Sequence, residues 1–100
     1  RISEVHIFCL DFSSALLANI LHSNYTLDFL ENNPNICKNL TETFLGMIKE
    51  NIPTSVLMHI LICLSYLSKE KFNTCKEECK FYDRITEFVE YYSQIKASKF

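Results

Sequence analysis

The sequence has very few of the residues that interrupt helices and form tight turns. It contains one glycine and two prolines in 100 residues. Strands and hairpins depend on such residues at their ends, so their scarcity disfavours an all-β fold and a fold of alternating strands and helices. The apolar share of 48% and the charged share of 22% are those of an ordinary globular chain, which argues against disorder. The composition therefore predicts an all-α domain.

The chain also lacks a surplus of positive charge. Ten basic and twelve acidic residues give a net charge of −2, and both kinds are interspersed. A nucleic-acid-binding surface needs clustered Lys and Arg to neutralise phosphates, so nucleic acid is not expected as a partner.

No segment has the pattern of a membrane span or a signal peptide. The apolar run at 52–68 is only about 17 residues long, contains His59 and has no interfacial anchors, so we expect a buried helix there. The N-terminus lacks the charged, apolar and small residues of a signal peptide in their usual order. Membrane insertion is therefore not expected.

The five cysteines are an odd number, so disulfides cannot pair all of them within one chain. Cys9, Cys37 and Cys63 each fall inside an apolar helical pattern, which favours reduced, buried thiols in a cytoplasmic protein. A secreted domain with two disulfides is the alternative, and glycosylation sequons at Asn24 and Asn39 would suit it. Both compartments stay open at this point, with the cytoplasm favoured.

Apolar periodicity predicts six helices in the order long, short, long, long, short, long. Their expected ranges are 2–22, 27–32, about 35–50, 53–68, 73–80 and 81–97. The run at 53–68 is apolar on its flanks as well as on one face, so it is expected to be the central helix. The first helix is apolar nearly all round. On the last helix the predicted inner face holds Tyr82, Ile85, Val89, Tyr92 and Ile95.

The helix order repeats with a period of about 45 residues. Leu-Thr-Glu at 40–42 is echoed by Ile-Thr-Glu at 85–87, and the segment 15–20 is echoed by 62–67. A short helix followed by two long ones, repeated at this period, is typical of helical solenoids.

This pattern resembles the armadillo repeat and its HEAT relatives, which have a short first helix and two longer antiparallel helices. The resemblance covers the whole chain, 1–100, as one all-α domain or a fragment of a longer right-handed solenoid. Residues 2–22 would be a third helix, 26–68 a full repeat and 73–97 a partial repeat. More faintly, the segment 11–17 resembles LisH-containing, cilia-associated armadillo proteins, which implies a cytoplasmic protein at the cilium or cytoskeleton.

The resemblance also implies a peptide-binding groove. The segment 15–20 looks like the end of an armadillo third helix, where the family's asparagine lines the concave groove, and Asn19 holds that position. In the next repeat Tyr66 stands where the asparagine is expected, and the usual glycine between the first two helices is missing. We expect Asn19, His59 and Tyr66 to share one concave face.

Candidate catalytic and metal-binding groups are few. Cys75 and Cys79 lie one helical turn apart, but a structural zinc site needs two further ligands. His6, His22 and His59 have no orienting carboxylate or oxyanion donors that the sequence identifies. We therefore predict no enzyme activity, no catalytic residue, no cofactor and no metal.

A chain with fewer than two complete repeats is expected to leave apolar surface at both ends. The residues expected to be exposed are Val5, Phe8 and Phe12 at one end and Phe88, Tyr91 and Tyr92 at the other. Exposed aromatic side chains are common anchors of protein interfaces, so Phe12, Tyr91 and Tyr92 are predicted partner contacts.

The predicted function is a non-catalytic scaffold that binds protein partners in a groove or through its open helical ends. Neighbouring repeats of a longer chain, or a second copy in a homodimer, would cover those ends. The alternative is a secreted four-helix bundle resembling short-chain cytokines, suggested by Cys-Lys-Glu-Glu-Cys at 75–79 before an amphipathic last helix.

Overall fold

The computed structural model describes residues 3–98, which form six α-helices, one 3-10 helix and no strand. The elements are α1 (Glu4–Leu21), α2 (Asn24–Glu31), α3 (Pro34–Met47), α4 (Thr54–Leu67), η1 (Glu70–Phe72, the 3-10 helix), α5 (Asn73–Glu78) and α6 (Phe81–Ser98). The prediction of an all-α chain, with its order of long and short helices, is confirmed over this part of the sequence.

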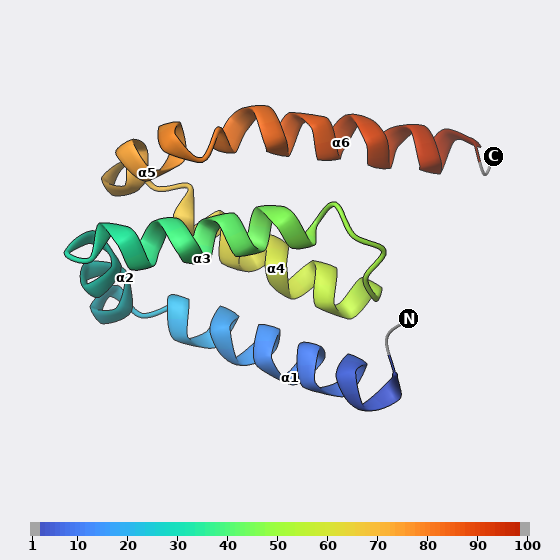
Figure 1. Ribbon diagram of the computed structural model, residues 1–100, viewed down its shortest axis with the longest axis horizontal. Coiled ribbons are helices and arrows are strands. Elements are labelled where there is room, and N and C mark those ends of the chain that lie inside the picture. Colours follow the sequence, from blue (N-terminus) through green and yellow to red (C-terminus); the bar gives the residue numbers. More distant parts are fainter. Residues whose placement is uncertain (1–2, 99–100) are drawn as a thin grey trace.

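The long helices lie in layers. Figure 1 shows α1 on one side, α3 and α4 in the middle and α6 on the other side, with the short helices α2 and α5 at one common end. Helix α1 packs on α4, α3 packs on α4 and α5, and α6 contacts α5 and α3. The principal extents are 44 × 31 × 20 Å, so the chain forms an elongated, thin body.

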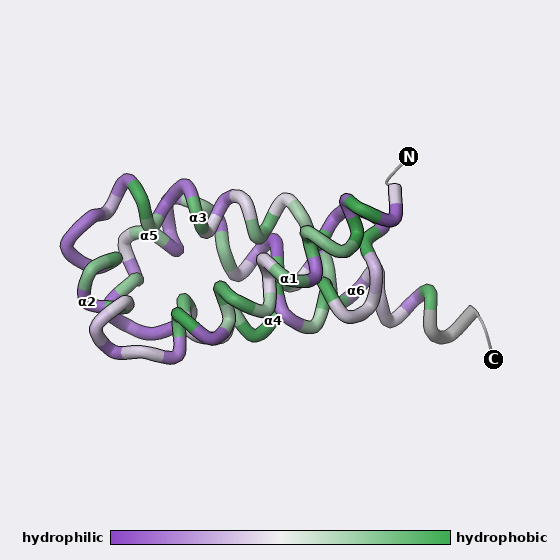
Figure 2. Tube along the Cα trace, turned by 90° about the horizontal axis from the view of Figure 1, so that it is seen from below, coloured by the Kyte–Doolittle hydropathy of each residue, from purple (hydrophilic) through white to green (hydrophobic). Residues whose placement is uncertain are grey.

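Helix α4 lies at the centre, as its apolar sequence predicts. Its buried residues are Val56, Ile60, Cys63, Leu64 and Leu67. Leu57 and Leu61, on the flank of this face, are only partly buried against the core. Figure 2 shows that hydrophobic residues continue along α1 and α4, whereas the turns around α2 are mostly hydrophilic.

The ends of several helices differ from the sequence prediction. Helix α2 begins at Asn24 rather than 27, because the Ser23 hydroxyl accepts a hydrogen bond from the Tyr25 amide at 3.2 Å and caps the helix. Helix α3 ends at Met47, about one turn early. Lys80, between α5 and α6, has a φ of 53°, the left-handed conformation that commonly ends a helix, and it turns the chain into α6.

The predicted inner face of α6 is wrong at three positions. Tyr82, Val89 and Tyr92 are exposed, while Phe81 is buried. Ile85 packs against the core, and so does Phe88, which was expected to be exposed. The apolar arc of α6 includes Phe81, Phe88 and Tyr91 beside the predicted positions, so periodicity does not decide which part of that arc faces inward. The positions of α3 and α5, which contact α6, make that choice.

Lys76 is buried, although no pattern in the sequence predicts it. Its ammonium group donates hydrogen bonds to the Ser68 carbonyl oxygen, after α4, and to the Tyr82 hydroxyl at 3.0 Å. A buried ammonium needs such partners because its desolvation is costly. Lys76 therefore links the end of α4, α5 and the start of α6.

Candidate interaction surfaces

Two polar pairs join α1 to α4. His59 Nδ1 lies 3.0 Å from Ser14 Oγ, and the Ser14 hydroxyl is 3.1 Å from the Asp11 carbonyl oxygen. A hydroxyl has one hydrogen, so a bond donated to Asp11 leaves Ser14 Oγ as the acceptor from His59 Nδ1–H. About two turns beyond this pair, His22 Nδ1 lies 2.7 Å from the Tyr66 hydroxyl, and the two rings meet edge to face with centroids 5.8 Å apart. These contacts fix α1 against α4.

The carboxylate near His59 does not complete a nucleophilic triad. Asp11 Oδ1 lies 3.6 Å from His59 Nδ1, the same ring nitrogen that Ser14 Oγ approaches. In a serine–histidine–carboxylate triad the serine and the carboxylate contact opposite ring nitrogens: one nitrogen takes the serine proton, and the carboxylate holds the N–H of the other. The arrangement here suits holding two helices together.

The three residues predicted to line a groove are divided between two places. His59 and Tyr66 use their polar atoms in contacts between α1 and α4. Asn19 is exposed on α1, one and two turns after Leu16 and Phe12 on the same side of the helix. The structure therefore associates Asn19 with the outer surface of α1.

We call the apolar side of α1 that faces away from α4 the outer stripe. It consists of Val5, Phe8, Phe12, Leu16 and Ile20, whose exposed fractions lie between 42% and 70%. The rings of Phe8 and Phe12 are stacked, with centroids 6.5 Å apart. Only Ser14 and Leu21 of α1 are buried. The expected exposure of Val5, Phe8 and Phe12 is thus confirmed, and the sequence analysis missed Leu16 and Ile20.

Helix α1 is also long and apolar enough to cross a membrane. This statement rests on its 18 residues and its composition, and only 11% of that window is buried. Core helices and N-terminal signal sequences pass the same test. The prediction that no segment spans a membrane rested on the run at 52–68 and did not cover α1.

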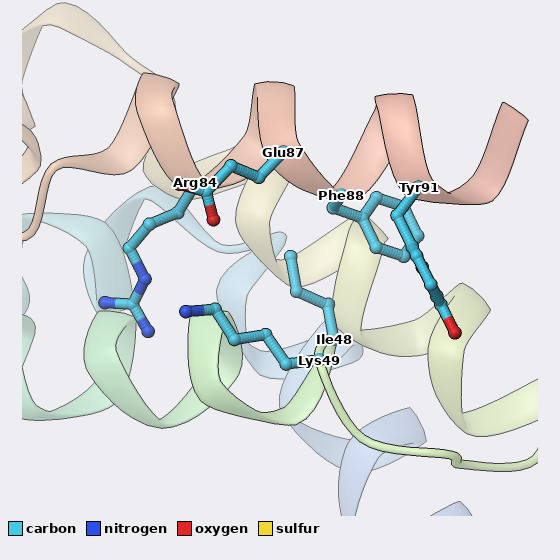
Figure 3. A pocket seen from close by; sticks show the side chains of 6 residues that line it. All are labelled: Ile48, Lys49, Arg84, Glu87, Phe88 and Tyr91. Atoms are coloured by element: carbon cyan, nitrogen blue, oxygen red, sulfur yellow. The ribbon is translucent and has the colours of Figure 1, made fainter. Parts of the chain in front are cut away.

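A second open surface lies beneath α6, and we call it the α6 groove. One part is a pocket of about 270 Å³ lined by Ile48, Lys49, Arg84, Glu87, Phe88 and Tyr91 (Figure 3). A larger pocket of about 500 Å³ shares Phe88 and Tyr91 and extends to Leu57 of α4 and Ile95 of α6. The predicted contact residues Tyr91 and Tyr92 both line this groove, and both are exposed.

An ion pair fixes the start of α6 above α3. Arg84 Nη1 lies 2.7 Å from Glu42 Oε2. This hydrogen bond from the guanidinium lowers the pKa of the Glu42 carboxyl group below its ordinary value. The first half of α6 is thereby held in place, while the second half forms one wall of the groove.

All five cysteines are free thiols, and all except the exposed Cys9 are buried. Burial raises the pKa of Cys63 to about 11 and that of Cys37 and Cys79 to about 12, where the nearby Cys75 adds to the effect. Within residues 3–98 no group of three or more His, Cys, Asp or Glu side chains is arranged to hold a metal ion.

Cysteine labelling should distinguish Cys9 from the other four thiols. Iodoacetamide at pH 8 should modify Cys9 in the folded chain, because Cys9 is exposed, whereas the other four thiols are buried and shielded from the reagent. Denaturation without reductant should make all five reactive, as counted by mass spectrometry. Fewer than five modifications in the denatured chain would indicate disulfides and favour the secreted four-helix alternative.

No protein-family model, curated protein or solved structure matches this chain, so the outer stripe and the α6 groove are assigned from its own residues.

Proposed function

We propose that the chain belongs to an armadillo/HEAT-like helical-repeat protein and acts as a non-catalytic scaffold. It binds other proteins through the outer stripe and the α6 groove. The observation that carries this proposal is the spacing of its contacts: seven side-chain hydrogen bonds join residues 34 to 45 positions apart. In a solenoid each repeat contacts only its neighbours, so long-range contacts fall close to one repeat length.

The packing of the helices supports the same arrangement. Two long helices lie against their counterparts one repeat later: α1 against α4, and α3 against α6. Lys71 of η1 extends this pairing to α2, with its ammonium 2.7 Å from Asp28 Oδ1 and 3.6 Å from Glu31 Oε1. These contacts agree with the predicted divisions at 2–22, 26–68 and 73–97.

The layering favours a solenoid over the four-helix alternative. A closed bundle of α1, α3, α4 and α6 would bring its first and last helices together around one core. Instead, α1 and α6 lie on opposite sides of the α3–α4 pair (Figure 1). We infer a cytoplasmic location, because four of the five thiols serve as small buried side chains of the kind that reducing compartments preserve.

Capture of partners from a cell lysate tests the scaffold function. The tagged chain is compared with Phe12→Glu, which places a charge on the outer stripe, and with Tyr91→Glu, which places one in the α6 groove. Because exposed aromatic anchors dominate many interfaces, at least one variant should lose bound proteins by about tenfold or more. Tyr25→Glu is the matched control, since Tyr25 is 85% exposed on α2, away from both surfaces. Identical sets of bound proteins for all four chains would rule out both surfaces as binding sites.

A further inference from the structure

We propose that the outer stripe of one copy of the chain docks in the α6 groove of a second copy, so that chains associate head to tail. This inference rests on the repeat arrangement proposed above, and it names a partner for both of its open surfaces.

The outer stripe corresponds to a face that already makes a helix contact elsewhere in the chain. Aligning 15–20 with 62–67 relates α1 to α4 by 47 positions. On α4, His59 and Tyr66 face α1 and bond to it. The residues 47 positions before them are Phe12 and Asn19, which are exposed. The outer stripe of α1 is thus equivalent to the face of α4 that packs against α1.

The matching surface lies on the opposite side of α4. On α1, Leu10 packs against the core and Ser14 receives His59 of α4. The residues 47 positions after them are Leu57 and Leu61, which are only partly buried. Leu57 lines the α6 groove, with Phe88 of α6 forming part of the other wall. A helix placed in this groove would contact both α4 and α6. Helix α4 makes the corresponding contacts with α1 and α3.

The size and charge of the outer stripe suit such a contact. Its five side chains expose roughly 500 Å² of apolar surface, taking about 150–250 Å² for a whole aromatic side chain. A standard interface buries about 800 Å² per partner, and about 57% of that, or about 450 Å², is non-polar. The stripe carries no charge, while the groove has both signs at its edge, including Lys49 and Glu50. Docking therefore brings no like charges together.

A protein surface fits α1 better than a lipid surface does. Helices that lie on anionic membranes are rich in Lys and Arg on their polar side. The charged residues of α1 are Glu4 and Asp11, and it has no Lys or Arg. The side of α1 opposite the outer stripe packs against α4, as in the contact between Ser14 and His59.

Sedimentation velocity of the whole chain tests the proposal through complementation. A head-to-tail contact joins two different surfaces and can continue into open chains, so the average mass should rise with concentration. Phe12→Glu and Tyr91→Glu should each remain monomeric, and Tyr25→Glu should behave as the unchanged chain. Mixing the two defective variants should give a one-to-one dimer, because one retains an intact groove and the other an intact stripe. The affinity of that dimer should exceed self-association of either variant by at least tenfold.

Several results would overturn the proposal. An unchanged chain that stays monomeric at high micromolar concentration would do so, as would a mixture of the two variants that forms no dimer. Dimers of Tyr91→Glu that are lost in Phe12→Glu would show that two outer stripes pair symmetrically instead. Flotation of the unchanged chain, but not of Phe12→Glu, with phosphatidylcholine–phosphatidylserine vesicles would identify a lipid surface as the occupant. All the substituted side chains are more than 60% exposed, and circular dichroism checks that the variants fold.

The two proposals fail separately. A monomeric chain whose lysate partners are lost in Phe12→Glu would contradict head-to-tail association and leave the scaffold function in place. If the chains associate head to tail but capture no other protein, only the proposal that the chain binds other proteins is contradicted.

Discussion

Replacing Leu64 by alanine should lower the free energy of unfolding by about 2–5 kcal/mol. Leu64 is 2% exposed and lies on α4, which packs against both α1 and α3. The surrounding helices cannot close fully over the deleted atoms, because the contact between His59 and Ser14 holds α1 at a fixed distance. Urea unfolding followed by circular dichroism measures the change.

The matched control is Met58→Ala on the same helix. Met58 is 56% exposed, so its truncation should change stability by no more than about 0.5 kcal/mol. Leu61→Ala should fall between the two, because Leu61 is partly buried. A loss below about 0.5 kcal/mol for Leu64→Ala would show that α4 is not the central helix.

Raising the pH from about 9 towards 11 should steadily destabilise the folded chain. The ordinary pKa of a cysteine thiol is 9.0, and burial raises the pKa of Cys63 to about 11. Between these values the thiol is ionised in the unfolded chain and protonated in the folded one, so unfolding releases a proton. Each such thiol lowers the free energy of unfolding by about 1.4 kcal/mol per pH unit. Below pH 9 the thiol is protonated in both states and its effect on stability disappears.

The slope of the free energy of unfolding against pH separates the ionisation of Cys63 from that of other groups that titrate at alkaline pH. Cys63→Ala should reduce the slope between pH 9.5 and 10.5 by about 1.4 kcal/mol per pH unit, whatever its effect on stability at pH 7. Cys9→Ala is the control and should leave the slope unchanged, because Cys9 is exposed. Equal slopes for Cys63→Ala and the unchanged chain would contradict a raised pKa at Cys63. Cys37 and Cys79, with pKa values of about 12, should contribute in the same direction.

The sequence by itself determined the helical class and the order of the helices. One glycine and two prolines cannot supply the turns of a sheet, and the apolar spacing gives each helix its approximate length. The central position of α4 also follows from sequence, because a helix with apolar flanks needs neighbours on more than one side. The exposure of Tyr91 and of Phe12 was predicted from the small number of repeats in the chain.

Only the tertiary structure decided which sides of the helices face each other. Helix α1 is apolar nearly all round, so periodicity gives its outer stripe no direction until α4 occupies the opposite side. The pairing of Ser14 with His59 and the burial of Lys76 join residues from different elements, and no local pattern encodes such contacts. The inner face of α6 was likewise chosen by α3 and α5, which place Phe88 rather than Val89 against the core. Local sequence fixes where the backbone is helical, whereas the face that is buried depends on which neighbour covers it.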